Sequence, residues 1–250
     1  MTMRIEVFFS PMQVPGSTVT GKVVAMIDVL RASSSIAAAL DAGARAVLPF
    51  DSADEVITRA KSFDRKEIIL AGERKMLPIA GFDLGNSPRE FTPDIVEGRA
   101  VLLTTTNGTA AVTTVQGARD IFIASYVNFT AVTALLRTAV RAETDVVLLC
   151  AGREKAFALE DAACAGRFVR HLLQDLPPVE LNDAAQAAVL IEKRYGDDID
   201  RVFADAEHGR ALRDAGFAHD LQACARLDAH PVIPVYQERQ ITKIGPDRER

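Results

Sequence analysis

Short apolar segments alternate with helix-forming segments over most of this 250-residue chain. The apolar run 23–29 leads into a helical stretch at 33–42, and the run 145–150 leads into another at 160–173. Strands with so little polar alternation are typically buried on both faces, and parallel strands need helical crossovers. The sequence therefore predicts an α/β fold: a mostly parallel sheet flanked by helices, with a second, smaller α/β or helical subdomain.

The pattern changes after the Pro-Pro pair at 177–178, and this change divides the chain into two parts. Residues 1–176 are predicted to form the α/β core that carries the active-site turns. Residues 177–250 are predicted to form a mainly helical C-terminal part with a last strand at 232–236, packed on the core. The polar tail from Arg239 is expected to fray.

Composition argues against several classes of protein. The net charge is −5 and no basic run stands out, so nucleic-acid binding is not expected. No apolar run reaches about 18 residues, so no membrane span is expected. The three cysteines, Cys150, Cys164 and Cys224, are widely spaced without a CxxC pattern, which indicates reduced thiols in the cytoplasm. Cys150 is interpreted as a core residue rather than a nucleophile.

Polar clusters follow several of the predicted strands. Asp28, Arg31 and three serines come after the run 23–29. Similar clusters follow four other strands, at 72–74, 104–109, 125–128 and 150–152. Turns at the carboxyl ends of parallel strands share one sheet edge, and helix N-termini there attract anions. Each cluster alone also fits a structural role, such as an N-cap for Asp28 or a tight turn for Asn107-Gly108. Their co-occurrence favours a binding pocket.

The side chains in these turns indicate a hard cation and a small anion. Arg31 and Arg74 offer bidentate donors for phosphate, carboxylate or sulfonate. Zinc is not expected, because the four histidines lie late in the chain without a HExxH pattern. P-loop, GxGxxG and GxSxG motifs are also absent from the sequence. Carboxylate oxygens, which Mg²⁺ prefers, come from Asp28, Glu73, Asp83, Glu160 and Asp161. The residues alone thus predict transfer or hydrolysis chemistry on a small anionic ligand.

A set of short motifs covers nearly the whole chain, from about Ile5 to Tyr236. They are 27–33 (IDVLRAS), 72–74 (GER), 81–88 (GFDLGNSP), 104–109 (TTTNGT), 150–152 (CAG), 159–166 (LEDAACAG), 220–224 and 232–234. Together they resemble the 2-phosphosulfolactate phosphatase family. The resemblance implies a Mg²⁺-dependent hydrolase that converts 2-phosphosulfolactate to sulfolactate, a step of coenzyme M synthesis. The chain departs from the family at Lys75-Met76, where glycine-like residues are expected, and at Ser34, where Thr is expected. The first departure concerns substrate choice more than reaction type.

The turn chemistry and the resemblance lead to a set of predicted site residues. Mg²⁺ is expected on Asp28, Glu73, Glu160 and Asp161. Catalytic roles are assigned to Asp28, Arg31, Asp83 and Asn107. Substrate binding is assigned to Ser33, Ser34, Arg74, Asn86, Ser87, Thr106, Gly108 and Thr109. Attack on the phosphate by water and attack by a protein carboxylate are both left open.

Two other functions fit the same residues. One is a phosphatase or phosphotransferase that acts on another small phosphorylated hydroxy acid. The other is a non-catalytic small-anion-binding protein, although carboxylates beside the arginines would oppose anion binding. A small phosphorylated anion is the expected partner, and a homodimer is a further expectation.

Overall fold

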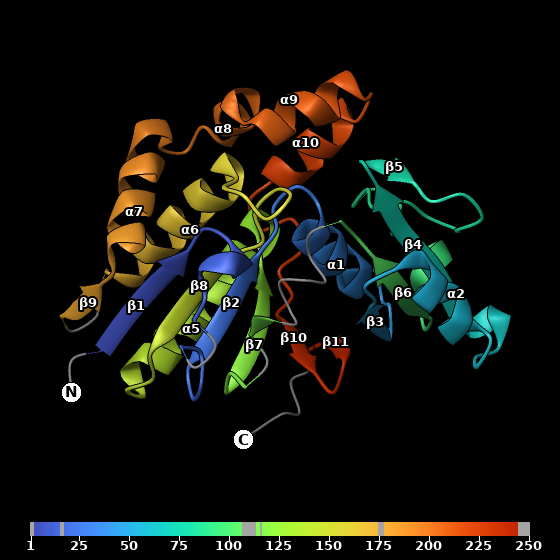
Figure 1. Cartoon of the computed structure of the whole chain (residues 1–250), viewed down its shortest axis with the longest axis horizontal. Helices are drawn as coiled ribbons and strands as arrows, with labels where there is room; N and C mark the ends of the chain where they lie inside the picture. The colour runs from blue at the N-terminus through green and yellow to red at the C-terminus, as the bar shows by residue number, and fades with distance from the viewer. Residues whose placement is uncertain (1–2, 16–17, 107–113, 116, 175–177, 245–250) are drawn as a thin grey trace.

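A single sheet runs through the protein and carries helices on its surfaces (Figure 1). The computed structural model describes residues 3–15, 18–106, 114–115, 117–174 and 178–244. Within these ranges the strands form one 11-stranded sheet, in the order β5-β4-β6-β3-β11-β10-β7-β2-β8-β1-β9. The strands are β1 (Met3–Phe8), β2 (Val23–Ile27), β3 (Ala46–Pro49), β4 (Ile68–Arg74), β5 (Leu77–Pro78), β6 (Ala100–Thr104), β7 (Asp120–Ala124), β8 (Val146–Cys150), β9 (Val179–Leu181), β10 (Pro234–Gln237) and β11 (Gln240–Lys243).

The helices connect most of these strands, and the predicted α/β fold is confirmed. They are α1 (Ala32–Asp41), α2 (Ala53–Ala60), α3 (Pro93–Val96), α5 (Phe129–Arg141), α6 (Leu159–Leu172), α7 (Asp183–Tyr195), α8 (Ile199–Asp205), α9 (Glu207–Asp214) and α10 (Ala218–Ala225), with 3₁₀ turns η1 (Pro11–Gln13), η2 (Arg65–Glu67) and η3 (Tyr126–Asn128). In the described ranges, no helix is both long and apolar enough to cross a membrane.

The sheet consists of two halves joined by a C-terminal hairpin. In one half β2 lies between β7 and β8, and all three strands are parallel. In the other half β3, β6 and β4 are parallel to one another. The hairpin β10–β11 pairs antiparallel with β7 on one side and, through Ile241 and Val47, with β3 on the other. As a result β3, β4 and β6 run opposite to β2, β7 and β8 across the sheet.

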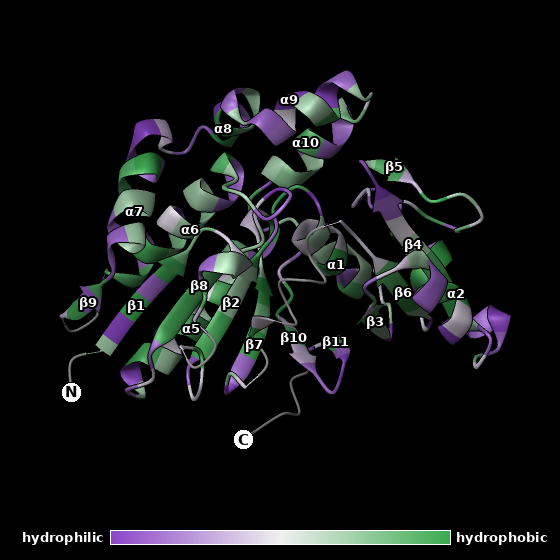
Figure 2. Cartoon of the chain, viewed as in Figure 1, coloured by the Kyte–Doolittle hydropathy of each residue, from purple (hydrophilic) through white to green (hydrophobic). Residues whose placement is uncertain are grey.

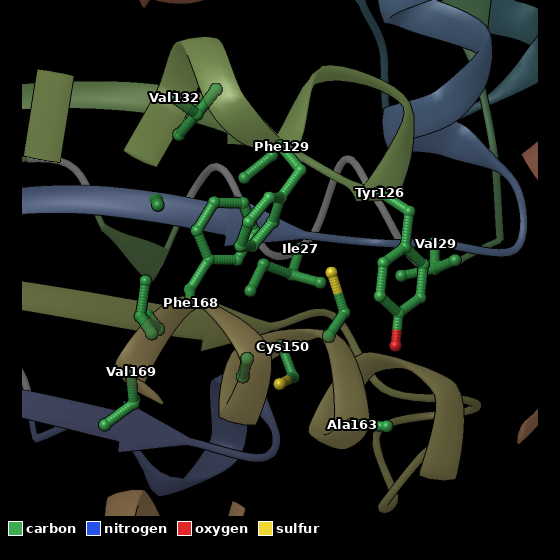
Figure 3. Packing of buried hydrophobic residues seen from close by; sticks show 14 of the residues in the cluster. Ile27, Val29, Tyr126, Phe129, Val132, Cys150, Ala163, Phe168 and Val169 are labelled. Atoms are coloured by element: carbon green, nitrogen blue, oxygen red, sulfur yellow. The ribbon is translucent and has the colours of Figure 1, made fainter. Parts of the chain in front are cut away.

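Strand β2 is buried on both faces, which explains its uninterrupted apolar sequence. Ala25 and Ile27 belong to the larger core, which β2 shares with α5 and α6, whereas Met26 belongs to a second core that includes residues of α1. Figure 3 shows part of the larger core, where the rings of Phe129 and Phe168 have centroids 4.6 Å apart. Figure 2 shows largely hydrophobic strands and hydrophilic residues on the outer helices. This packing fixes the turn after β2, where the first polar cluster begins.

The C-terminal part contains the predicted helices and two strands that the sequence did not predict. β9 pairs with β1 at one end of the sheet. The prediction that the chain frays from Arg239 is wrong for residues 240–243, which form β11. Glu238 and Arg239 close this hairpin with left-handed φ angles of 52° and 63°. Because neither is Gly or Asn, the sequence carries no turn signal there. The boundary at residue 176 stays a prediction.

All three cysteines are expected to be unreactive in the folded protein. Cys150, Cys164 and Cys224 are buried free thiols. Burial raises the pKa of Cys150 and Cys164 well above the usual range and that of Cys224 to about 12, and only the thiolate reacts. With Ellman's reagent at pH 8 the native protein should therefore release almost no thiolate colour, and the protein in guanidinium should show all 3 thiols. A fast-reacting thiol in the native protein would contradict the structural interpretation of Cys150.

Candidate active site

A cavity of about 270 Å³ lies beyond the ends of β2, β4, β6 and β8, beside α9. Its lining consists of Asp28, Leu30, Arg31, Glu73, Lys75, Met76, Asn86, Thr105, Thr106, Arg153, Glu154 and His208. These residues come from both halves of the sheet, although the halves run in opposite directions. In Figure 1, β5 and the helices α9 and α10 lie on the same upper side of the view. The cavity brings together five of the predicted site residues, Asp28, Arg31, Glu73, Asn86 and Thr106.

Asp28 follows β2 and is held by the start of α1. Its Oδ1 accepts the N–H of Ala32 at 3.2 Å, and its own N–H donates to Ser33 Oγ at 2.9 Å. Burial raises the pKa of Asp28 to about 6. The carboxylates of Glu73 and Glu160 add to the rise, whereas His208 and the Ala32 N–H oppose it. The cavity therefore concentrates negative charge that a bound cation would neutralise.

Glu73 is fixed at the end of β4 by donors from two other segments. Its Oε1 accepts the N–H of Thr106 at 2.7 Å, and its Oε2 accepts the N–H of Met76 at 2.9 Å and the Thr106 hydroxyl at 3.1 Å. The preceding Gly72 is required by close approach of the strands, since a Cβ there would lie 2.4 Å from the backbone oxygen of Thr104. The GER motif thus places one carboxylate in the cavity wall.

Arg31 is buried in the cavity wall and has fixed partners. Its Nη1 donates to Asp220 Oδ2 at 2.6 Å, and its Nη2 donates to the backbone oxygen of Met76 at 2.8 Å. The guanidinium carbon lies 4.4 Å from the ring centroid of Phe217. Ser87 Oγ also donates to Asp220, through Oδ1 at 2.6 Å. Arg31 therefore presents a positive charge to the cavity, and its position is set by Asp220 in α10 and by Phe217 just before that helix.

The predicted metal ligands Glu160 and Asp161 are buried, and neither is among the cavity-lining residues. Asp161 accepts the N–H groups of Val29 at 2.9 Å and Gly152 at 3.1 Å, so it ties the turn after β2 to the turn after β8. Burial raises the pKa of Asp161 well above its usual range, and Glu160 adds to this rise. Glu160 Oε1 lies 3.2 Å from Nδ1 of His208, which does line the cavity. Their role as metal ligands stays a prediction.

The oxygen donors that line the cavity fit Mg²⁺. Asp28 and Glu73 supply carboxylates, and Asn86 Oδ1 is a buried oxygen with no hydrogen-bond donor in the described part of the chain. A buried acceptor of this kind needs a partner, and a cation or a water would satisfy it. Among the described residues, no group of three or more His, Cys, Asp or Glu side chains forms a complete metal cage. Mg²⁺ does not need one, because it usually keeps several waters and binds one or two carboxylates plus substrate oxygens.

The predicted serines use their hydroxyl groups within the protein. Ser33 accepts from Asp28 as described, and Ser34 Oγ donates to the backbone oxygen of Val29 at 2.9 Å and lies 2.8 Å from Ser125 Oγ. These bonds stabilise the turn that holds the carboxylate. Direct substrate binding by Ser33, Ser34 and Ser87 stays a prediction.

Arg74 and Asp83 lie outside the cavity lining. Arg74 Nη2 donates to Thr104 Oγ1 at 2.9 Å. Asp83 pairs with Arg65 and accepts the N–H of Leu70 at 2.8 Å, so its contacts stabilise the segment beside β4. Three further predicted residues, Asn107, Gly108 and Thr109, lie outside the described residues.

Sequence reasoning missed the cavity residues Arg153, Glu154 and His208. Arg153 follows Gly152, whose φ of +68° suits glycine and whose Cβ, if present, would lie 2.1 Å from the backbone oxygen of Ala156. This tight turn could have been inferred from the CAG motif. His208 lies in α9 without any motif, and only the tertiary fold brings it to the cavity.

Comparisons with known proteins agree with one another. A family model described as 2-phosphosulpholactate phosphatase matches residues 8–239, which include every lining residue of the cavity. A Symbiobacterium thermophilum protein named "Probable 2-phosphosulfolactate phosphatase" is 38% identical over 227 residues, covering 91% of this chain and 96% of the relative. A Clostridium botulinum protein of the same name is 34% identical over 242 residues, covering 97% and 100%. A Nostoc sp. protein, again of that name, is 35% identical over 246 residues, covering 96% and 99%.

Proposed function

Because the chain belongs to the 2-phosphosulfolactate phosphatase family, we propose that it hydrolyses 2-phosphosulfolactate to sulfolactate and phosphate, with Mg²⁺ as cofactor. The observation that carries the proposal is the composition of the cavity: Asp28, Glu73 and the buried Arg31 all line it. Carboxylates for a hard cation beside an arginine for an anion are the groups that phosphoryl transfer requires. The modest volume of the cavity suits a small metabolite.

Asp28, Glu73 and Asn86 would hold the Mg²⁺. When bound, the ion supplies positive charge that neutralises the phosphoryl oxygens. Arg31 adds a second positive charge, and its bond to Asp220 keeps the guanidinium in place as charge develops on the phosphate. Attack by water would release phosphate without a covalent intermediate on the protein, whereas attack by Asp28 would transfer the phosphoryl group to its carboxylate. Protein quenched with acid during turnover would carry hydroxylamine-labile phosphate only in the second case.

The proposal is tested by phosphate release from 2-phosphosulfolactate. The purified protein should release phosphate with saturation kinetics, lose the activity in EDTA and regain it when Mg²⁺ is restored. Omission of the protein and use of heat-unfolded protein control for substrate breakdown. Binding of 2-phosphosulfolactate without phosphate release in Mg²⁺ would favour an anion-binding protein. Equal rates on several unrelated phosphorylated hydroxy acids would favour the broader phosphatase.

We also propose that the protein acts in the cytoplasm. Its three cysteines are free and buried, which suits a reducing compartment. The proposed substrate is a small soluble anion. A homodimer remains a prediction, which light scattering after size-exclusion chromatography would test.

A further inference from the structure

The turn between β4 and β5 places two residues at the cavity despite an unfavourable backbone conformation. Arg74 pairs with Leu77, so Lys75 and Met76 are the two central residues of the hairpin. Their φ angles are 51° and 72°, in the left-handed region that favours glycine and asparagine. Both residues line the same cavity as Asp28. Glycine would adopt this turn with less strain, so the presence of Lys75 and Met76 suggests that their side chains have a function.

The two arginines that line the cavity are already paired with carboxylates. Arg31 is bound by the buried Asp220. Arg153 Nη1 lies 2.7 Å from Oε1 of Glu207. Lys75, by contrast, is an exposed residue, and no hydrogen bond or ion pair involves its ammonium in the part of the chain that the structure describes. An anion that meets Lys75 therefore gains a charge pair without breaking an existing one.

We propose that Lys75 is a specificity-determining residue that binds an acid group of the substrate other than the phosphate, either a carboxylate or a sulfonate. The inference rests on the proposed function, because it assigns the phosphate to the region of Asp28 and Glu73. An ammonium is a compact charge on a flexible stem, so it accepts either anion without a fixed geometry. The selected class is small phosphomonoesters that carry at least one additional acid.

The first test compares Lys75→Met with wild type on three substrates: 2-phosphosulfolactate, 2-phospholactate and p-nitrophenyl phosphate. The variant keeps the length of the side chain and removes its charge. For 2-phosphosulfolactate, kcat/KM should fall about 10-fold, mainly through KM. For p-nitrophenyl phosphate, which has no additional acid, kcat/KM should stay within about 2-fold. A fall with 2-phospholactate identifies the carboxylate as the bound group, and no change identifies the sulfonate. The matched control Lys66→Met removes an exposed lysine outside the cavity and should change none of the three values.

A second readout separates binding from turn stability. By calorimetry, sulfolactate should bind Lys75→Met about 10-fold more weakly than wild type. Lys75→Gly should show the same loss, yet its melting temperature should not fall below wild type, because glycine suits the φ of 51°. An equal effect of Lys75→Met on p-nitrophenyl phosphate, or no effect on any substrate and on sulfolactate binding, would overturn the inference. Lack of phosphate release by wild type would instead overturn the proposed function, and sulfolactate binding would still test Lys75.

Discussion

Replacing Asp28 by Asn should lower kcat/KM for phosphate release by about 10³-fold or more. The amide has nearly the shape of the carboxylate, and its oxygen still accepts the N–H of Ala32, so the turn after β2 should keep its conformation. The substitution removes only the negative charge that faces the cavity. Whether the Asp28 carboxylate binds the cation or attacks the phosphate, the amide cannot replace it in that role. Large loss of rate with little loss of stability is therefore expected.

The measurement is steady-state phosphate release across Mg²⁺ concentrations, together with a urea unfolding curve. Asp54→Asn is the matched control, because Asp54 is exposed in the first turn of α2, away from the cavity. It should leave both kcat and KM within about 2-fold of wild type. An Asp28→Asn variant that retains more than about a tenth of wild-type kcat/KM at saturating Mg²⁺ would refute the central role of Asp28.

The turn after β2 could be predicted from sequence because its signals are local. An apolar run, one Asp, an Arg and three serines already specify a buried strand that meets a helix N-terminus, and the structure places Asp28 and Arg31 in one cavity. The GER motif could be predicted only in part. Glu73 and Arg74 are neighbours in β4, and successive side chains of a strand point to opposite faces. Since Glu73 faces the cavity, Arg74 faces away from it, and strand alternation would have shown that only one could line the site.

The remaining cavity residues depend on contacts that a local pattern does not encode. His208 lies on a short helix far along the chain, and Arg31 meets Asp220 across 189 positions. The opposite directions of the two half-sheets follow from the β10–β11 hairpin, whose turn residues Glu238 and Arg239 resemble ordinary surface residues. The prediction that the turns converge is confirmed, but its premise, that all of them lie along the carboxyl edge of one parallel sheet, is wrong. They meet across two antiparallel halves rather than along one parallel edge.

Replacing Asp220 by Ala should destabilise the protein by about 3–5 kcal/mol, the cost of leaving one charge of a buried pair without its partner. The side chains of Arg31 and Asp220 are only 2% and 3% exposed, so water cannot solvate the remaining guanidinium without rearrangement. Ser87 would also lose its hydrogen-bond acceptor. Activity should fall as well, since Asp220 fixes the position of the cavity arginine. The free energy of unfolding in urea is the quantity to measure.

A double-mutant cycle separates the pair from its individual charges. Arg31→Met alone leaves the Asp220 carboxylate unpaired and should also cost about 3–5 kcal/mol. The cycle is closed by Asp220→Leu alone, which leaves the guanidinium unpaired. The double variant Arg31→Met with Asp220→Leu buries no charge, so it should be more stable than either single variant, although Arg31 makes a further bond to the Met76 backbone oxygen. Asp214→Ala, an exposed change at the end of the neighbouring α9, should lie within about 0.5 kcal/mol of wild type. If the destabilisations of the single variants simply added in the double variant, packing against Phe217 rather than the charge of Asp220 would hold Arg31 in place.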